Sequence, residues 1–136
     1  MRITIDGNIG SGKTSLMKTL QDWSTRRLDP SAFRWNIDCH YEPVEWWSSK
    51  ETDHLLAKQY ADPTRWSLTC QLMIAASHAT IYRDDSTNCR DDCTIASKQS
   101  LTIVERSAVG NKLFAQKAME LGWMTAGEWV IYNHVT

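Results

Sequence analysis

The apolar and polar residues of the first 26 positions predict a strand, a glycine-rich turn and a helix. β-Branched and polar residues alternate over residues 2–6, and Gly7 follows them, as happens when a short strand ends in a turn. Apolar residues then recur at helical spacing from Thr14 to about Arg26. The segment therefore reads as a strand that feeds a helix through a glycine-rich loop.

The middle of the chain predicts an edge strand followed by helices. Residues 37–41 alternate between apolar and polar side chains and stop before a proline, which is typical of a half-exposed strand. Residues 44–60 are mixed and are expected to be partly helical. Asp62 as N-cap and Pro63 at the first helical position predict a helix that runs to about Tyr82.

The last third of the chain predicts a loop, a buried strand and two helices. Residues 83–100 are polar and charged and are expected to form a flexible loop, whereas the apolar run 101–104 is typical of a buried parallel strand. Helical spacing over 114–121 and a capping-box pattern at 125–128 predict the final helices. Strands that alternate with helices indicate an α/β fold with a mainly parallel sheet, of which three strands are present.

Composition narrows the classes of function. The 136 residues fit one domain, and 15 Lys and Arg against 16 Asp and Glu give a net charge of -1, which disfavours nucleic acid and membrane surfaces as partners. The N-terminus has no signal or transit peptide pattern, so we expect a cytoplasmic protein. The four cysteines, including the close pair Cys89 and Cys93, are expected to be free thiols.

The glycine-rich loop is the clearest chemical signal in the sequence. It matches the phosphate-binding pattern G-x-x-x-x-G-K-[ST] in full, between a predicted strand and a predicted helix. The loop consists of Gly7, Asn8, Ile9, Gly10, Ser11, Gly12, Lys13 and Thr14. Its amides would bind the phosphates of ATP, Lys13 would reach the β- and γ-phosphates, and Thr14 would ligate Mg²⁺. The alternative, a glycine-rich turn that binds nothing, explains neither the full match nor its context.

Three charged residues lie where predicted strands end. Glu42 follows the second strand, and Glu105 and Arg106 close the third. In an open parallel sheet the carboxyl ends of the strands line the ligand crevice, so we expect all three to face the site that Gly7 opens. A carboxylate there can take a proton from an acceptor hydroxyl, and an arginine can offset charge on a transferred phosphoryl group. Alternatively, either glutamate is an ordinary surface residue after a strand.

Four ordered segments resemble the deoxyribonucleoside kinase family, which includes deoxycytidine, deoxyguanosine and mitochondrial thymidine kinases, insect multisubstrate enzymes and viral relatives. The segments are the loop at 7–14, Glu-Pro-Val-Glu-Trp-Trp at 42–47, the stretch from Tyr to Gln at 60–71, and Glu-Arg-Ser at 105–107. The resemblance implies a three-layer fold of the P-loop NTPase type and transfer of phosphate from ATP to the 5′-hydroxyl of a deoxyribonucleoside, as in nucleoside salvage.

The resemblance also implies a role for each site residue. Glu42 would be the general base and Arg106 would hold the hydroxyl and the incoming phosphoryl group, with Lys13 on the donor phosphates. Glu105 would help Thr14 bind Mg²⁺.

Substrate recognition would fall to a second set of residues. Tyr60 would contact the 3′-hydroxyl, Gln71 would hydrogen-bond the base with Ile74 on the same helix face, and Trp47 would pack beside the base. Core packing is the alternative for both aromatic residues.

Position 78 leaves the preferred base open. His78 stands where the cytidine- and guanosine-using branch of the family carries arginine and the thymidine-using branch carries methionine. The acidic partner of that arginine would fall near Gly110 or Asn111, and neither is acidic, which favours a thymidine-like or broad specificity. A neutral core histidine is the alternative.

The resemblance covers residues 1–136 as the N-terminal part of a single kinase domain, because family members continue into further strands and an arginine-bearing lid. The first strand, central in the family, would then lie at a sheet edge. Since lid arginines stabilise transition-state charge, the alternative function is a nucleotide-binding chain without turnover that associates with another chain. A homodimer is a further expectation from the family. For a viral member the expected location is the host cytoplasm, and the family also leaves a mitochondrial location open.

Overall fold

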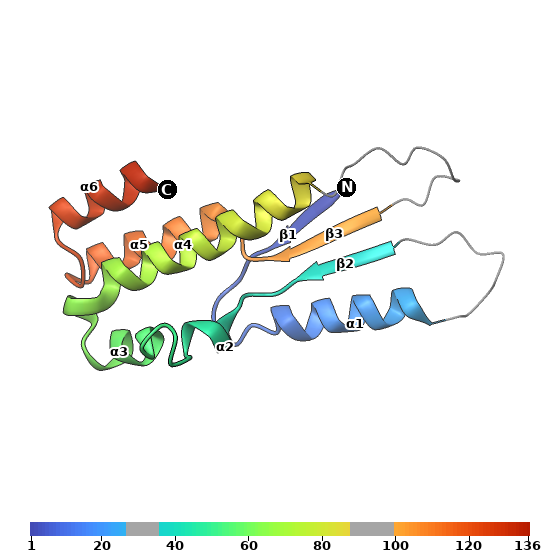
Figure 1. The fold of residues 1–136 in the computed structure, drawn as a ribbon, viewed down its shortest axis with the longest axis horizontal. Coiled ribbons are helices and arrows are strands. Elements are labelled where there is room, and N and C mark those ends of the chain that lie inside the picture. Colours follow the sequence, from blue (N-terminus) through green and yellow to red (C-terminus); the bar gives the residue numbers. More distant parts are fainter. Residues whose placement is uncertain (27–35, 88–99) are drawn as a thin grey trace. The chain divides into compact units, whose positions relative to one another are not determined.

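The computed structural model describes residues 1–26, 36–87 and 100–136. They form two compact units, each described separately (Figure 1). The first unit takes its residues from Met1–Glu42 and Thr87–Ser107, and the second unit comprises Pro43–Ser86 and Ala108–Thr136.

The first unit is a parallel sheet with one helix. In its described part the strands are ordered β1-β3-β2, so β1 and β2 lie at the edges and β3 lies between them (Figure 1). Ile103 of β3 is level with Ile3 of β1 and with Cys39 of β2. The elements are β1 (Arg2–Ile5), α1 (Lys13–Thr25), β2 (Asn36–His40) and β3 (Ser100–Glu105).

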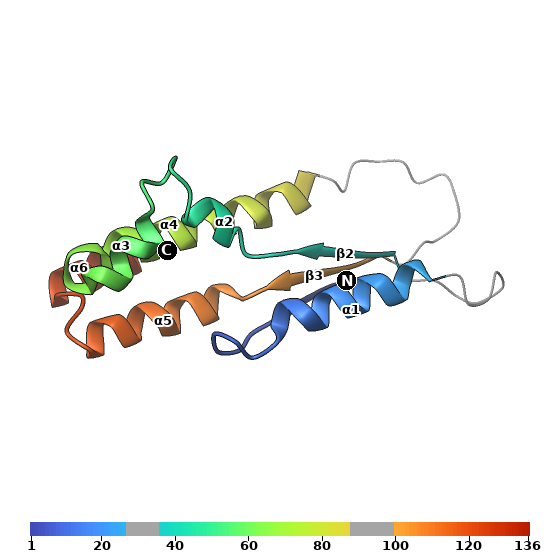
Figure 2. The same ribbon diagram turned by 90° about the horizontal axis from the view of Figure 1, so that it is seen from below.

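The core of the first unit lies between α1 and the sheet. Met17 of α1 is fully buried against Ile37 of β2 and Ile103 of β3. Figure 2 shows α1 running along the sheet beside β2 and β3. The apolar stripe of α1 and the β-branched residues of the strands thus meet across one layer boundary, as an α/β layer requires.

The second unit is helical. Its core consists of Ala115, Ala118, Met124 and Tyr132, with Leu68 and Leu72 of α4 packed against it. The helices are α2 (Val44–Trp47), α3 (Leu55–Ala61), α4 (Pro63–Thr87, whose last residue is assigned to the first unit), α5 (Ala108–Glu120) and α6 (Ala126–Val135).

Two predicted helix starts are confirmed. The Arg65 amide donates to Asp62 Oδ1 at 3.2 Å, so Asp62 caps α4. Thr125 and Glu128 form the predicted capping box, in which the Glu128 amide donates to Thr125 Oγ1 and the Thr125 amide donates to Glu128 Oε2. The Thr125 amide and the Thr125 hydroxyl both donate to the Glu128 carboxylate, and these two hydrogen bonds lower the pKa of that carboxyl below its usual range.

The α/β fold with parallel strands and the edge position of the second strand are confirmed. The predicted loop is wrong in its first residues, because α4 continues to Thr87 rather than ending near Tyr82. Residues 83–87 are polar but contain neither Pro nor Gly, and polarity alone indicates exposure rather than the end of a helix. At the other end β3 begins at Ser100, and residues 88–99 lie outside the described part.

Two of the four cysteines can be described. Cys39 and Cys70 are free thiols, whereas Cys89 and Cys93 lie outside the described residues. Burial raises the pKa of the Cys70 thiol to about 11, so this thiol is protonated at neutral pH and is a core residue of α4. Within the described ranges, no helix has the length and apolar character to cross a lipid bilayer.

Replacing the buried methionine of α1 is expected to destabilise the first unit. Met17→Ala should lower the free energy of unfolding by about 3 kcal/mol, because it leaves a cavity against Ile37 and Ile103. Its neighbour Leu16 is 50% exposed, so Leu16→Ala should cost less than about 1 kcal/mol. Urea unfolding followed by circular dichroism measures both losses, and equal losses would contradict the assigned core.

Candidate active site

The glycine-rich loop connects β1 to α1 and has the backbone that an anion site needs. Gly10 and Gly12 have φ angles of 76° and 85°, in the left-handed region that residues with a Cβ disfavour. The Ser11 amide donates to Asn8 O at 3.2 Å, which closes a turn inside the loop. Gly12 is the N-cap of α1 and offers no capping side chain. The first amides of α1 can therefore serve an anion.

Lys13 lies against this loop. Its side chain is 8% exposed, and Nζ donates to Asn8 O at 3.0 Å. The ammonium group is thus fixed beside the loop backbone before any ligand binds. A phosphate group that enters the loop would meet both this cation and the positive end of the α1 dipole.

Thr14 and Glu105 bring two oxygen ligands together. Thr14 Oγ1 donates to Glu105 Oε1 at 2.8 Å, which joins the start of α1 to the end of β3. Glu105 is 5% exposed. A hydroxyl and a carboxylate beside a phosphate loop are ligands that Mg²⁺ accepts together with water and phosphate oxygens, so these residues fit that ion.

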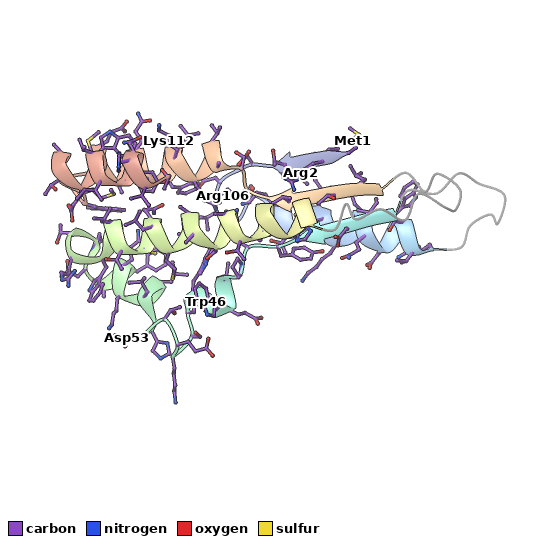
Figure 3. All side chains as sticks on the ribbon, turned by 45° about the horizontal axis from the view of Figure 1, so that its top comes forward. Met1, Arg2, Trp46, Asp53, Arg106 and Lys112 are labelled. Atoms are coloured by element: carbon purple, nitrogen blue, oxygen red, sulfur yellow. The ribbon has the colours of Figure 1, made fainter. Side chains whose placement is uncertain are left out.

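Glu42 and Arg106 form an ion pair at the same edge of the sheet. Arg106 Nε lies 2.5 Å from Glu42 Oε1, and Nη2 lies 3.5 Å from Oε2. Both side chains are only about one-tenth exposed. Glu42 lies just after β2, and Arg106 directly follows β3, where Figure 3 labels it. The two residues that sequence reasoning assigned to the acceptor hydroxyl are therefore in contact.

The backbone at Arg106 is unusual. Its φ angle is 66°, a conformation that costs a residue with a Cβ roughly 1–2 kcal/mol. The Arg106 amide donates to Ile5 O at 2.9 Å, and the Ser107 amide donates to Asp6 Oδ1 at 2.9 Å. Sequence reasoning missed Asp6. Its position supplied a signal, since Asp6 follows β1 as Glu42 follows β2.

In the second unit, Trp47 and His78 are packed together. Trp47 is 4% exposed and its Nε1 donates to Ser77 Oγ at 3.0 Å. The ring centroids of Trp47 and His78 are 6.4 Å apart, and His78 is 1% exposed. Both side chains therefore lie in the interior of the second unit.

The other predicted substrate residues differ in exposure. Tyr60 of α3 is 69% exposed, which rules out core packing as the reason for this residue. Gln71 is 6% exposed and Ile74 is half-buried, both on α4. The segment that precedes α3 in the chain can be followed in Figure 3, which labels Trp46 on α2 and Asp53 on the connection from α2 to α3.

The second unit also contains a cavity of about 800 Å³. It lies between α4, the first turn of α5 and the end of α6, and its walls are mainly apolar. His78 and Asn111 are its buried polar residues, and Asn111 is 3% exposed. Of the predicted substrate residues in the described chain, His78 alone lines this cavity.

Comparison with known proteins decides the family. The family model for deoxynucleoside kinases matches residues 3–136. The chain belongs to the deoxynucleoside kinase family. A fowlpox virus (strain NVSL) protein named as a probable deoxycytidine kinase is 33% identical over 97% of this chain and 46% of its own length. The mitochondrial deoxyguanosine kinase of Xenopus laevis is 28% identical over 97% of this chain and 50% of its own length. The deoxycytidine kinase of Mus musculus is 30% identical over 97% of this chain and 52% of its own length. The chain thus spans about half the length of these relatives.

The ion pair of Glu42 and Arg106 should contribute measurably to stability. Glu42→Gln removes the carboxylate from a mostly buried guanidinium, so the free energy of unfolding should fall by about 3 kcal/mol. Adding Arg106→Met to Glu42→Gln removes the buried cation and should recover part of the loss.

The exposed pair of Lys117 and Glu120 provides the matched control. Its side chains are 63% and 45% exposed, so Glu120→Gln should cost less than about 1 kcal/mol. Urea unfolding measures all three variants, and equal losses for Glu42→Gln and Glu120→Gln would contradict a buried pair.

Proposed function

We propose that the chain takes part in transfer of the γ-phosphoryl group of ATP to the 5′-hydroxyl of a deoxyribonucleoside. One observation supports this most directly. Consecutive residues Glu105 and Arg106 contact Thr14 of the phosphate loop and Glu42, respectively. A candidate metal ligand, an arginine and a candidate base therefore lie in the same unit as the loop at 7–14, and the first of them contacts that loop.

The donor side depends on the loop at 7–14. Its amides and the start of α1 would bind the β- and γ-phosphates, and Lys13 Nζ would move from Asn8 O to a phosphate oxygen. Thr14 and Glu105 would hold Mg²⁺, which neutralises charge on the phosphate oxygens when it is bound.

The acceptor side depends on Glu42 and Arg106. In the transfer, the 5′-oxygen forms a bond to the γ-phosphorus, the bond from that phosphorus to the β,γ-bridging oxygen breaks, and the 5′-hydroxyl proton passes to Glu42. Arg106 would stabilise charge on the transferred group while it remains near Glu42. Because the pair is mostly shielded from water, its electrostatic interactions are stronger than they would be at the surface.

Nucleoside recognition is proposed for residues of the second unit. Gln71 carries a planar amide suited to a base edge, and the exposed phenol of Tyr60 can bind a sugar hydroxyl. Trp47 would support the base pocket through packing, since its indole N–H already bonds Ser77. Relatives named for deoxycytidine and deoxyguanosine make those bases candidates, whereas His78 and Asn111 favour a thymidine-like or broad preference.

A phosphate-transfer assay tests the proposed reaction. The chain is incubated with radiolabelled ATP, Mg²⁺ and each of the four natural deoxynucleosides, and a labelled 5′-monophosphate is expected. Lys13→Ala should lower the rate by at least about 10²-fold, because it removes the cation on the transferred phosphate. Lys18→Ala changes an exposed lysine of α1 and should leave the rate unchanged.

Calorimetric titration with ATP separates the two candidate functions. ATP binding that needs Lys13, with no product from any deoxynucleoside, would favour the binding chain without turnover. The absence of both product and ATP binding in a folded sample would overturn both.

Position 78 can be tested by its effect on base preference. His78→Met should change the ratio of kcat/KM for thymidine to that for deoxycytidine by about tenfold or more, because it replaces a polar side chain by an apolar one. The exposed histidine of α6 supplies the control, His134→Met, which should leave the ratio unchanged. An unaltered ratio in His78→Met would assign His78 to the core alone.

A further inference from the structure

The turn after β3 has a strained residue at its centre. Among the described residues of the first unit, Arg106 is the non-glycine residue with a positive φ. A residue with a Cβ keeps such a conformation only where its surroundings hold it there. The hydrogen bonds of the Arg106 amide and of the next amide therefore help to hold this backbone in place.

One of these hydrogen bonds comes from the sheet and the other from a side chain. The pairing of β1 with β3 ends at Ile5 and Glu105, and the Arg106 amide still reaches Ile5 O. The next amide, that of Ser107, is instead bound by the carboxylate of Asp6 at 2.9 Å. Asp6 thus extends the link between the two chain segments one residue beyond the strands.

Asp6 lies between both halves of the proposed chemistry. It directly precedes Gly7, the first residue of the phosphate loop. The residue before Ser107 is the arginine that contacts Glu42, and the residue before that contacts Thr14. A single side-chain hydrogen bond therefore connects the start of the donor loop to the turn that presents Arg106.

We propose that Asp6 is a positioning residue for the phosphoryl transfer, because its carboxylate binds the Ser107 amide and holds Arg106 in the left-handed turn that directs its guanidinium to Glu42. This inference rests on the proposed function for its catalytic meaning. Its structural content, a hydrogen bond that controls an ion pair, can be measured without turnover.

Two substitutions at position 6 separate the hydrogen bond from the charge. Asp6→Asn keeps a side-chain oxygen that can accept from the Ser107 amide, whereas Asp6→Ala removes the acceptor. Asp22→Ala changes an exposed aspartate of α1 and serves as the matched control. If Asp6 acts through this hydrogen bond, Asp6→Asn should keep the Ser107 amide and the Arg106 guanidinium as they are in the unaltered chain, and Asp6→Ala should change both.

Nuclear magnetic resonance of the full chain provides the readouts. In the unaltered chain, hydrogen exchange at the Ser107 amide should be slowed at least about tenfold relative to an unstructured peptide. In Asp6→Ala this protection should be lost, and the Arg106 Nε–H resonance should shift toward its position in Glu42→Gln. Asp6→Asn should retain both signals, and Asp22→Ala should leave them unchanged. Calorimetry should find ATP affinity in Asp6→Ala within about twofold of the unaltered chain, because the phosphate ligands remain.

Each result bears on the proposal. An unprotected Ser107 amide in the unaltered chain overturns it, and so does an Arg106 resonance that Asp6→Ala leaves in place. Equal effects of asparagine and alanine would assign the role to charge and likewise overturn it. If Asp6→Ala does not fold, the Ser107 protection and the asparagine variant still decide.

If turnover is found, Asp6→Ala should lower kcat about tenfold or more with an unchanged KM for ATP. A chain without turnover in which these resonances behave as expected would count against the reaction and not against the role of Asp6.

Discussion

The parallel pairing of β3 with both β1 and β2 is the constraint on which the candidate site depends. Parallel strands point the same way, so the residues that follow them gather at one edge of the sheet. The pairs Ile5 with Glu105 and His40 with Val104 set that edge to within one residue. One acidic residue follows each outer strand, Asp6 after β1 and Glu42 after β2. Both acids contact the turn after the central strand, where Glu42 pairs with Arg106 and Asp6 binds the next amide. A slip of one residue would turn the strand side chains to the opposite face and would separate these groups.

The partners of the carboxylates at this edge explain how acidic side chains can lie near a loop that is proposed to bind phosphate. Glu42 is neutralised by Arg106, and Asp6 accepts a backbone amide. The side chain of Glu105 accepts a hydrogen bond from the Thr14 hydroxyl, in the first turn of α1, and in the described residues it forms no ion pair. A polyphosphate in the loop would place further negative charge near Glu105, which is unfavourable unless a cation lies between them. The contact between Thr14 and Glu105 therefore supports the proposal that Mg²⁺ would accompany a nucleotide in this loop.

Sequence reasoning succeeded where local patterns carry the information. The alternation over residues 2–6, the complete loop motif and the capping chemistry of Asp62 and Thr125 are short-range signals, and the elements they predict are present. Placing Glu42 beside Arg106 needed one further rule, that parallel strands end together. The hydrogen bond from Ser107 to Asp6 joins segments about one hundred residues apart, and the positive φ of Arg106 lies beside it. No local sequence pattern encodes either feature. The predicted end of α4 is wrong for the opposite reason, because the polar residues 83–87 favour a loop by composition, although they contain no residue that ends a helix.

Two aromatic residues of the second unit that belong to family-like segments differ in burial. Trp47 and Tyr60 belong to two of the segments that resemble the family, and core packing was the alternative for both. Trp47 is buried with its indole N–H bound to Ser77, so its polar group is satisfied within the protein. Tyr60 is mostly exposed, and packing within its own unit gives no reason for a large aromatic side chain at that position. Burial therefore separates the two residues, because Trp47 links α2 to α4 in the interior of the second unit, whereas the Tyr60 side chain is accessible to solvent.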